Sequence, residues 1–398
     1  MFANYREIFE IAGALRFSIA GFVARIHLSM DRLALLFIVV HKTGSYGLAG
    51  LMVATASIVI TIAQPFWARA ADFYGQGRIL YLNTILRFIS FTIFILLVQF
   101  DFPIWTWFVS IVIAESNTIN AGSLVRRRWV HILPNPKLKT TAYSFESLVD
   151  EIIFVFGPLL ATFLATNVSP VSCLIASMAF VIIGQPALAK LRDSEPKVEK
   201  VKKDLNALNI IKRKSAQAII LPVFFVGGYF GSVGIVVVAF ANKAGTPEIS
   251  GLLLAVWALG SATSALVNGV VGIDFSPAKI FIYSLIFMFI MSLGLFFTNS
   301  PLTLGIALFL NGLGISPLLV NAFATMEQEV SQEELTEAMT WVITGTPTGG
   351  AIGSAIAGQV IDNFGVNQGF LIPVLALFLA NLALLPYIRQ WHRLRSRP

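Results

Sequence analysis

Three carboxylates stand inside one long apolar stretch of this sequence, where lipid would not solvate them. The stretch is SFESLVDEIIFVFGPLLATFLA, residues 144–165, and its acids are Glu146, Asp150 and Glu151. Because a charge inside a bilayer is costly, each acid is a candidate for a functional site or for an ion pair with another helix. Glu146 and Asp150 are four residues apart and share a helix face, whereas Glu151 lies about 100° away. Both interpretations, strut and proton-coupling acid, stay open.

Two further apolar stretches carry candidate site residues. Arg25 and Asp31 lie in the first, six residues apart, a spacing that does not favour a simple pair along one helix. Glu115 lies near the centre of the fourth, followed by Asn117 and Asn120. A buried glutamate is suited to proton exchange, and Arg25 is a plausible partner for it. We treat all five residues as candidates for binding a solute or coupling to protons.

The second half of the chain has few charges in its apolar stretches. Its candidates are polar or aromatic side chains that could line a binding site: Tyr229, Asn311, Asn321 and Trp341. Core packing is the alternative for the aromatic residues. Gly349 and Gly353, four residues apart, predict a face for close helix packing.

Helices that cross a bilayer must position these residues. The chain has 398 residues, of which 56% are hydrophobic and 12% charged, and its mean hydropathy is +0.79. A helix needs about 20 apolar residues to cross the hydrocarbon core. Twelve stretches meet this length: 13–40, 47–68, 79–99, 103–126, 141–166, 170–190, 216–242, 248–272, 278–298, 301–326, 334–362 and 367–388. We therefore expect an all-α, polytopic membrane protein.

The sequence lacks the motifs that are typical of several kinds of enzyme and metal site. The single cysteine, Cys173, excludes an internal disulfide and a cysteine metal cluster, and the four histidines are scattered. Neither a phosphate-binding Gly-x-x-x-x-Gly-Lys-Ser/Thr loop nor a His-Glu-x-x-His motif is present. We expect no enzyme activity, no cofactor and no metal site.

The basic residues predict the topology. If both termini are cytoplasmic, the inner segments hold 22 of the 28 Lys and Arg residues. This bias predicts a multi-pass protein of the plasma (inner) membrane with both termini inside. It also accounts for the net charge of +7 without a nucleic-acid partner.

The chain divides into two similar halves. A basic stretch, residues 191–215, separates six expected spans from six others. The segments that begin at Gly50 and Thr141 align weakly with those that begin at Gly251 and Glu337. Such internal repeats are typical of transporters. The expected parts are an N-terminal bundle (1–190), a cytoplasmic linker (191–215), and a C-terminal bundle with a short basic tail (216–398).

These features resemble the major facilitator superfamily. The loop ARAADFYGQGR, residues 68–78, is similar to its signature Gly-x-x-x-Asp-Arg-x-Gly followed by basic residues, with Asp72, Gly75 and Arg78 in matching positions. Gly157-Pro158 resembles the core of the antiporter signature. The fourth stretch reads NTINAG in place of the family's Arg-x-x-Gln-Gly. The resemblance implies twelve helices in two pseudo-symmetric six-helix bundles.

Four further phrases resemble a group of actinobacterial permeases of this family: TGSYGLAG, TAYSFESLVDEIIFVFGP, VAFANKAG and TEAMTW. The gating candidates are the signature-loop residues, together with Gly157, Pro158 and a contact between the acid Glu146 and the cations Arg126 and Arg127. Membrane anchoring is the alternative for the two arginines.

The sequence thus predicts a secondary active transporter that moves a small organic solute by alternating access, with proton-coupled export as the favoured direction. Its expected partners are the solute, protons and the lipid bilayer, and it is expected to be a monomer. A nutrient importer or uniporter is the alternative of the same fold. A lipid scramblase or a sensor is the alternative of another class.

Overall fold

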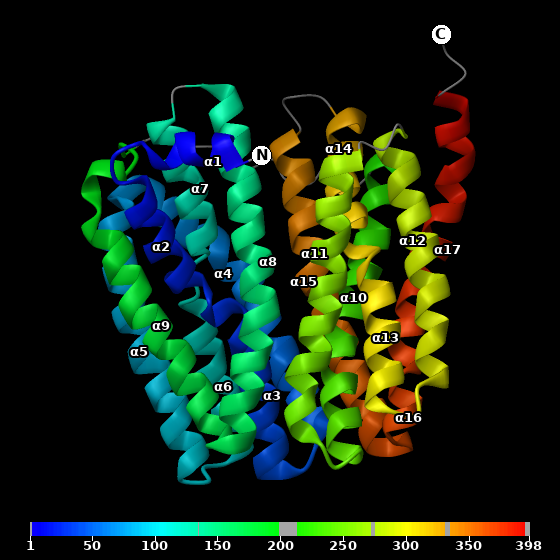
Figure 1. The fold of residues 1–398 in the computed structure, drawn as a ribbon. Helices are drawn as coiled ribbons and strands as arrows, with labels where there is room; N and C mark the ends of the chain where they lie inside the picture. Colours follow the sequence, from blue (N-terminus) through cyan, green and yellow to red (C-terminus); the bar gives the residue numbers. More distant parts are fainter. Residues whose placement is uncertain (1, 134, 199–212, 272–274, 331–334, 395–398) are drawn as a thin grey trace. The chain divides into compact units, whose positions relative to one another are not determined.

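The computed structural model describes residues 2–133, 135–198, 213–271, 275–330 and 335–394, and these residues form helices without any strand (Figure 1). The chain forms two compact units, unit 1 (Met1–Ile38 and Ile58–Lys203) and unit 2 (Val39–Ser57 and Asp204–Pro398). The end of the first predicted span and the start of the second therefore pack within unit 2. The linker predicted at 191–215 lies largely outside the described residues.

The helices of the first half follow the predicted stretches. Their bounds are α1 Phe2–Phe9, α2 Ala14–Arg25, α3 His27–Thr43, α4 Tyr46–Tyr74, α5 Gln76–Gln99, α6 Ile104–Ser116, α7 Ala121–Ile132, α8 Pro136–Asn167 and α9 Pro170–Lys190. Two predicted spans are interrupted, the first between α2 and α3 and the fourth between α6 and α7. The apolar pattern predicts a single uninterrupted helix in both places, so the two breaks correct that expectation.

The helices of the second half are interrupted in a comparable way. Their bounds are α10 Lys214–Lys243, α11 Ser250–Val271, α12 Pro277–Leu293, α13 Pro301–Gly312, α14 Ile315–Glu329, α15 Leu335–Phe364, α16 Val366–Gly369 and α17 Leu371–Leu394. The tenth predicted span is broken between α13 and α14. It is the counterpart of the fourth, so both repeats interrupt the same helix.

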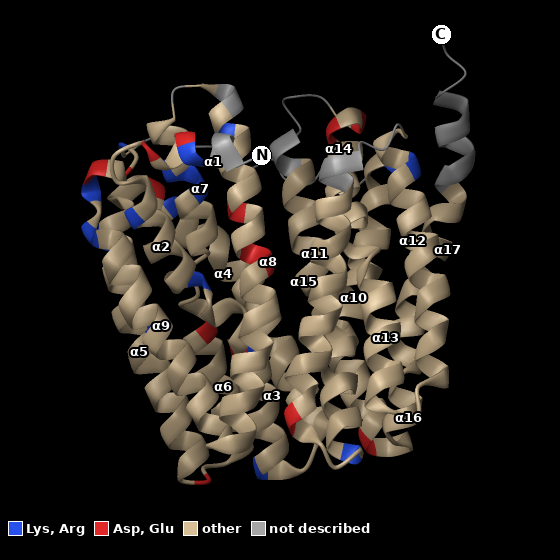
Figure 2. Ribbon diagram, viewed as in Figure 1, with Lys and Arg blue, Asp and Glu red and all other residues tan. Residues whose placement is uncertain are grey.

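Ten of the described spans are long and apolar enough to cross a membrane. The first predicted span, residues 13–40, is not among them, and it carries four charged residues, Arg16, Arg25, Asp31 and Arg32. The eleventh, α15, is rich in glycine, serine and threonine between residues 344 and 358. In unit 2 the charged residues gather near the helix ends, whereas unit 1 also has charges part-way along its helices (Figure 2).

An aromatic core closes one end of unit 1. The Trp129 ring lies edge-on to Phe17 and Phe9, with centroid distances of 4.7 and 6.0 Å, and Phe9 also contacts Phe145. These contacts hold the short helix α1 against α7 and α8. Trp129 is fully buried, which fixes the end of α7 beside α8.

Unit 2 is built around the close approach of α10 and α15. A Cβ atom added at Gly349 would overlap the backbone carbonyl of Phe224, and one at Gly353 would overlap that of Gly228. The predicted packing face is therefore confirmed. Because the two backbones touch, no side chain larger than hydrogen fits at these positions.

Candidate functional site

The break in the first span separates two buried charged groups. Arg25 ends α2, Ile26 forms a single turn residue, and His27 begins α3. The Ser29 hydroxyl donates to the Ile26 carbonyl at 2.9 Å and satisfies a backbone group near the break. Arg25 and Asp31 are 1% and 4% exposed. The geometry gives them separate partners, as their spacing predicted.

The break in the fourth span is held by side chains that bond its freed backbone groups. The Trp67 indole donates to the Ser116 carbonyl at 2.6 Å, and the Asn83 amide donates to the Asn117 carbonyl at 2.9 Å. Asn120 caps α7, since its side chain accepts from the Ser123 amide. Non-helical backbone at membrane depth needs such partners. The Asn117 carbonyl and the Asn120 side chain thus help to hold this break, and the solute-binding or coupling role expected of these two residues stays a prediction.

The two breaks bring six side chains of unit 1 together in what we call the Arg87 cluster: His27, Asp31, Arg87, Glu115, Thr118 and Ser177. Every member is less than 10% exposed. The Arg87 Nη2 atom lies 2.5 Å from Asp31 Oδ2, and its Nη1 atom lies 3.5 Å from Glu115 Oε2. One guanidinium on α5 therefore joins an acid on α3 to an acid on α6.

Neutral groups complete this cluster. His27 Nδ1 lies 2.8 Å from Asp31 Oδ2, and the Ser177 hydroxyl donates to the other oxygen of the same carboxylate. Thr118 donates to Glu115 at 2.6 Å. Within the described residues, Glu115 Oε1 and His27 Nε2 are buried without a hydrogen-bond partner. The cluster can therefore accept a proton.

The cluster's charges do not cancel. Two carboxylates, Asp31 and Glu115, share the single buried guanidinium of Arg87. Arg32 also interacts electrostatically with both acids, from an exposed position outside this buried set. With both acids ionised and His27 neutral, the buried set has an excess of one negative charge.

A second group of unit 1, the Arg25 cluster, contains Arg25, Arg126, Trp129, Glu146 and Asp150. Arg25 donates to Glu146 at 2.5 Å and to Asp150 at 2.9 Å. Arg126 contacts the other oxygen of Asp150 at 2.6 Å, and the Trp129 indole donates to Glu146 at 2.8 Å. The two cations match the two acids, so this cluster is electrically balanced.

The predicted pairing of Arg25 with Glu115 is wrong. Arg25 contacts the two acids on α8, and Glu115 contacts Arg87 instead of Arg25. Sequence reasoning did not name His27, Arg87, Thr118 or Ser177 as site residues. Arg87 carried a usable signal, because it is a lone arginine inside the apolar stretch 79–99. Glu151, the third acid of α8, is partly buried.

Comparison with known proteins identifies the fold to which this site belongs. The family model of the Major Facilitator Superfamily matches residues 17–242 and again residues 219–397. The chain belongs to the major facilitator superfamily. Membership makes it a membrane transporter rather than an enzyme, and it confirms the expected fold of twelve helices in two six-helix bundles.

Solved structures of transporters share this fold. The nucleoside transporter NupG matches with a TM-score of 0.75 at 12% identity, over 96% of this chain and 99% of that one. A bacterial homologue of the iron transporter ferroportin, in an inward-facing state, gives 0.72 at 13%, over 94% and 98%. The human organic anion transporter MFSD10 gives 0.60 at 13%, over 93% and 98%. No curated protein matches this chain in sequence.

The superfamily's signature loop is an ordered turn between α4 and α5. Asp72 forms an ion pair with Arg127 on α7. Gly75 has a φ of +90°, which favours glycine, and the Gly77 amide donates to Glu195 at 2.9 Å. Arg78 is exposed.

The three consecutive arginines of this transporter have three different partners. Arg126 contacts Asp150 and Arg127 contacts Asp72, whereas Arg128 donates to Gln76 at 2.8 Å. Successive helix residues point about 100° apart, which explains the divergence. Arg126 therefore contacts Asp150 of α8, whereas Glu146 contacts Arg25 and Trp129, so the contact predicted between Glu146 and the two arginines is wrong.

Gly157 and Pro158 lie within α8. A Cβ atom added at Gly157 would overlap the Ser29 side chain, so the glycine permits α8 to approach α3 closely. The antiporter role that the resemblance implies for this pair stays a prediction.

The candidate residues of the second repeat mainly serve helix packing. Tyr229 is buried against Trp257, with ring centroids 5.7 Å apart. Asn311 donates to the Met288 carbonyl at 2.8 Å, and Asn321 donates to the Pro317 carbonyl of its own helix at 2.7 Å. Trp341 is partly buried on α15. The solute-binding role predicted for all four stays a prediction.

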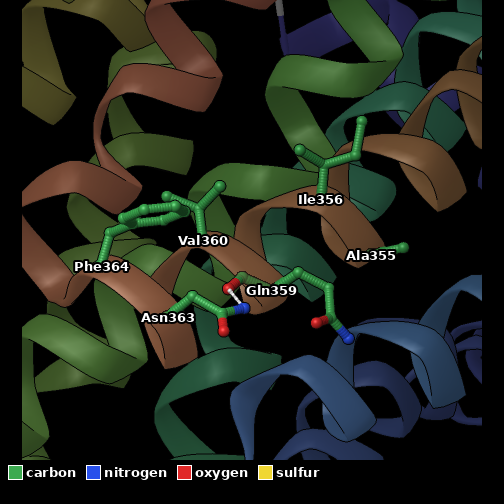
Figure 3. Close-up of a pocket in the computed structure, with 6 residues that line it drawn as sticks. All are labelled: Ala355, Ile356, Gln359, Val360, Asn363 and Phe364. Atoms are coloured by element: carbon green, nitrogen blue, oxygen red, sulfur yellow. Dashed lines mark hydrogen bonds between the residues drawn. The ribbon is translucent and has the colours of Figure 1, made fainter.

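Two surface hollows offer little for a polar solute. The first, of about 270 Å³, lies on α15 alone (Figure 3) and is lined by Ala355, Ile356, Gln359, Val360, Asn363 and Phe364. The second, of about 460 Å³, lies in unit 1 against α2, α8 and α9. Its lining residues are Phe22, Ile26, Ile152, Ile153, Phe156, Gly157, Leu159, Leu160, Phe163 and Phe180. All of them are apolar, so it lacks the charged groups of the Arg87 cluster.

Proposed function

We propose that this protein is a secondary active transporter that exports a small organic solute across the plasma membrane, driven by protons. It works as a monomer by alternating access, and both termini face the cytoplasm. The fold supports transport, and the distribution of Lys and Arg supports the orientation. The Arg87 cluster supports the coupling to protons.

The observation that carries proton coupling is the excess negative charge of that cluster. An uncompensated charge in a buried site costs several kcal/mol, and a proton removes it. Glu115 is the acid that takes the proton, because Asp31 is held at both oxygens whereas Glu115 Oε1 has no hydrogen-bond partner among the described residues. His27 Nε2 is the second buried position at which a proton could bind.

The Arg25 cluster, unlike the Arg87 cluster, has no excess negative charge. Arg25 and Arg126 neutralise Glu146 and Asp150, so a proton would remove an attraction instead of an excess charge. We assign this cluster a structural role as a strut that ties α2 and α7 to α8. It provides a matched control, because it places a second buried carboxylate in the same unit.

Flux in proteoliposomes with an imposed pH gradient tests the proposal. The similar structures include a nucleoside transporter, a bacterial homologue of an iron transporter and an organic anion transporter. Uridine, Mn²⁺, p-aminohippurate and the amphipathic cation ethidium therefore form the first panel. For the compound that is transported, we expect the gradient to drive flux in the wild type and Glu115→Gln to abolish that response. A gradient-driven flux that survives Glu115→Gln would overturn the assignment of the proton site.

Accumulation in cells tests the direction. An exporter lowers the internal level of the transported compound relative to cells that express Glu115→Gln. A higher internal level would make the protein an importer. If no panel compound moves, a protein-dependent exchange of labelled phospholipid between leaflets would favour a scramblase instead.

A further inference from the structure

The carboxylate of Asp362, near the end of α15, binds the beginning of α4, and both segments belong to unit 2. It accepts from the Ser45 hydroxyl at 2.6 Å, from the Tyr46 amide at 2.8 Å and from the Gly47 amide at 2.8 Å. These residues are more than 300 positions apart in the sequence. Nothing in the sequence pattern connected them.

Helix chemistry explains why a carboxylate binds here. The first amides of a helix have no partner within it, and the helix dipole makes this end positive. Asp362 accepts hydrogen bonds from the first two backbone amides of α4. The Ser45 hydroxyl accepts from the third, the Leu48 amide, at 3.0 Å. An acid on α15 thus completes the cap of α4.

Glycines bring the two backbones together at the same place. A Cβ atom added at Gly358 would overlap the Tyr46 carbonyl, and one at Gly50 would overlap the Ser354 carbonyl. A Cβ atom at Gly47 would lie 2.7 Å from the Gln359 amide nitrogen. In Figure 3 the Gln359 amide points toward the blue ribbon of the first repeat. The contact is specific in shape as well as in charge.

The contact differs from the buried ion pairs in its exposure. Asp362 is exposed, so water can replace its three hydrogen bonds when the helices part. Glu146 is fully buried, and separating it from Arg25 would leave two unsolvated charges. The Asp362 contact can therefore open at low cost, whereas the Arg25 cluster cannot.

We propose that Asp362 is the releasable part of a clasp, formed with Ser45, Tyr46 and Gly47, that opens once in each transport cycle. The proposal rests on the alternating access of the proposed function. Helix α4 is continuous, yet residues 46–57 pack within unit 2 and residues 58–74 within unit 1. A stiff helix cannot keep both attachments if the units move, and the exposed one is the one that releases. The predicted topology places the clasp at the outer end of the transporter.

A distance measurement between spin labels tests the clasp. Labels at Lys42→Cys and Gln368→Cys, both at exposed positions of unit 2, report the separation of the α3–α4 turn from the end of the α15 region. In lipid nanodiscs we expect Asp362→Asn to raise the fraction of the longer distance about five-fold, because a neutral amide loses the attraction to the helix end. Ser45→Ala shifts the fraction in the same direction, and Asp362→Glu restores part of the wild-type distribution.

Asn363→Ala is the matched control. Asn363 is the next residue of α15, is exposed, and donates to the Gln359 carbonyl of its own helix. It should leave the distance distribution unchanged. An unchanged distribution in Asp362→Asn would overturn the clasp. If the distribution shifts but no panel compound is transported, the clasp stands and the proposed transport function fails.

Discussion

Arg87 on α5 contacts Asp31 on α3 at 2.5 Å, and its planar group lies 4.5 Å from the ring centroid of Phe91. The same guanidinium faces Glu115 on α6. A single cation thus holds three helices of unit 1 and leaves one carboxylate in excess. We therefore expect both the stability of unit 1 and the proposed proton binding to depend on this residue.

Replacing Arg87 by methionine should destabilise the protein by roughly 3–5 kcal/mol, because it leaves Asp31 without its buried cation. Thermal unfolding in detergent measures the change. Arg6→Gln is the control. The side chains of its ion pair, Arg6 and Glu10, are 83% and 64% exposed, so this substitution should change the unfolding temperature much less. Equal effects of the two substitutions would contradict the assigned role of Arg87.

Glu115 should titrate as a single buried carboxyl group without any solute present. Infrared difference spectra between acidic and alkaline buffer should show a carboxyl stretching band that Glu115→Gln removes. The band should persist in Glu146→Gln, since two cations face the two acids of the Arg25 cluster and leave no excess negative charge there. If Glu146→Gln removes the band and Glu115→Gln does not, the assignment of Glu115 as the proton-binding acid is wrong.

Two acids on one face of α8 should differ in their contribution to stability. Glu146 is completely buried and Asp150 has a side-chain exposure of 34%. Glu146→Gln should therefore cost about 3 kcal/mol and Asp150→Asn clearly less, because water compensates Arg126 and part of Arg25. Parallel unfolding curves of the two variants check this order.

Replacing two glycines of unit 2 by alanine should affect the free energy of unfolding differently. At Gly349 the added methyl group meets the Phe224 carbonyl, so Gly349→Ala should cost about 1–3 kcal/mol by forcing α10 and α15 apart. At Gly234 nothing lies within 4 Å of the added carbon. Gly234→Ala should therefore be neutral or slightly stabilising in the same unfolding assay. A tolerated Gly349→Ala would show that the helices can separate.

The sequence by itself determined the membrane-crossing stretches, the repeat and the family. These properties are local or statistical: the length of an apolar stretch, the side on which arginine and lysine gather, and the match between two halves. It also placed Glu146 and Asp150 on one face of α8, because helix geometry fixes positions four residues apart. The packing face at Gly349 and Gly353 follows from the same regularity.

Only the tertiary structure decided which charges meet. Arg25 pairs with acids 121 and 125 residues away, and Asp362 caps a helix that begins 316 residues earlier. Periodicity along one helix does not specify its neighbours, and a break at Ile26 or after Ser116 rotates every side chain that follows. Strut and proton site could therefore not be told apart in the sequence. Our proposed distinction rests on the count of cations around each buried acid, and that count exists only once the helices are packed.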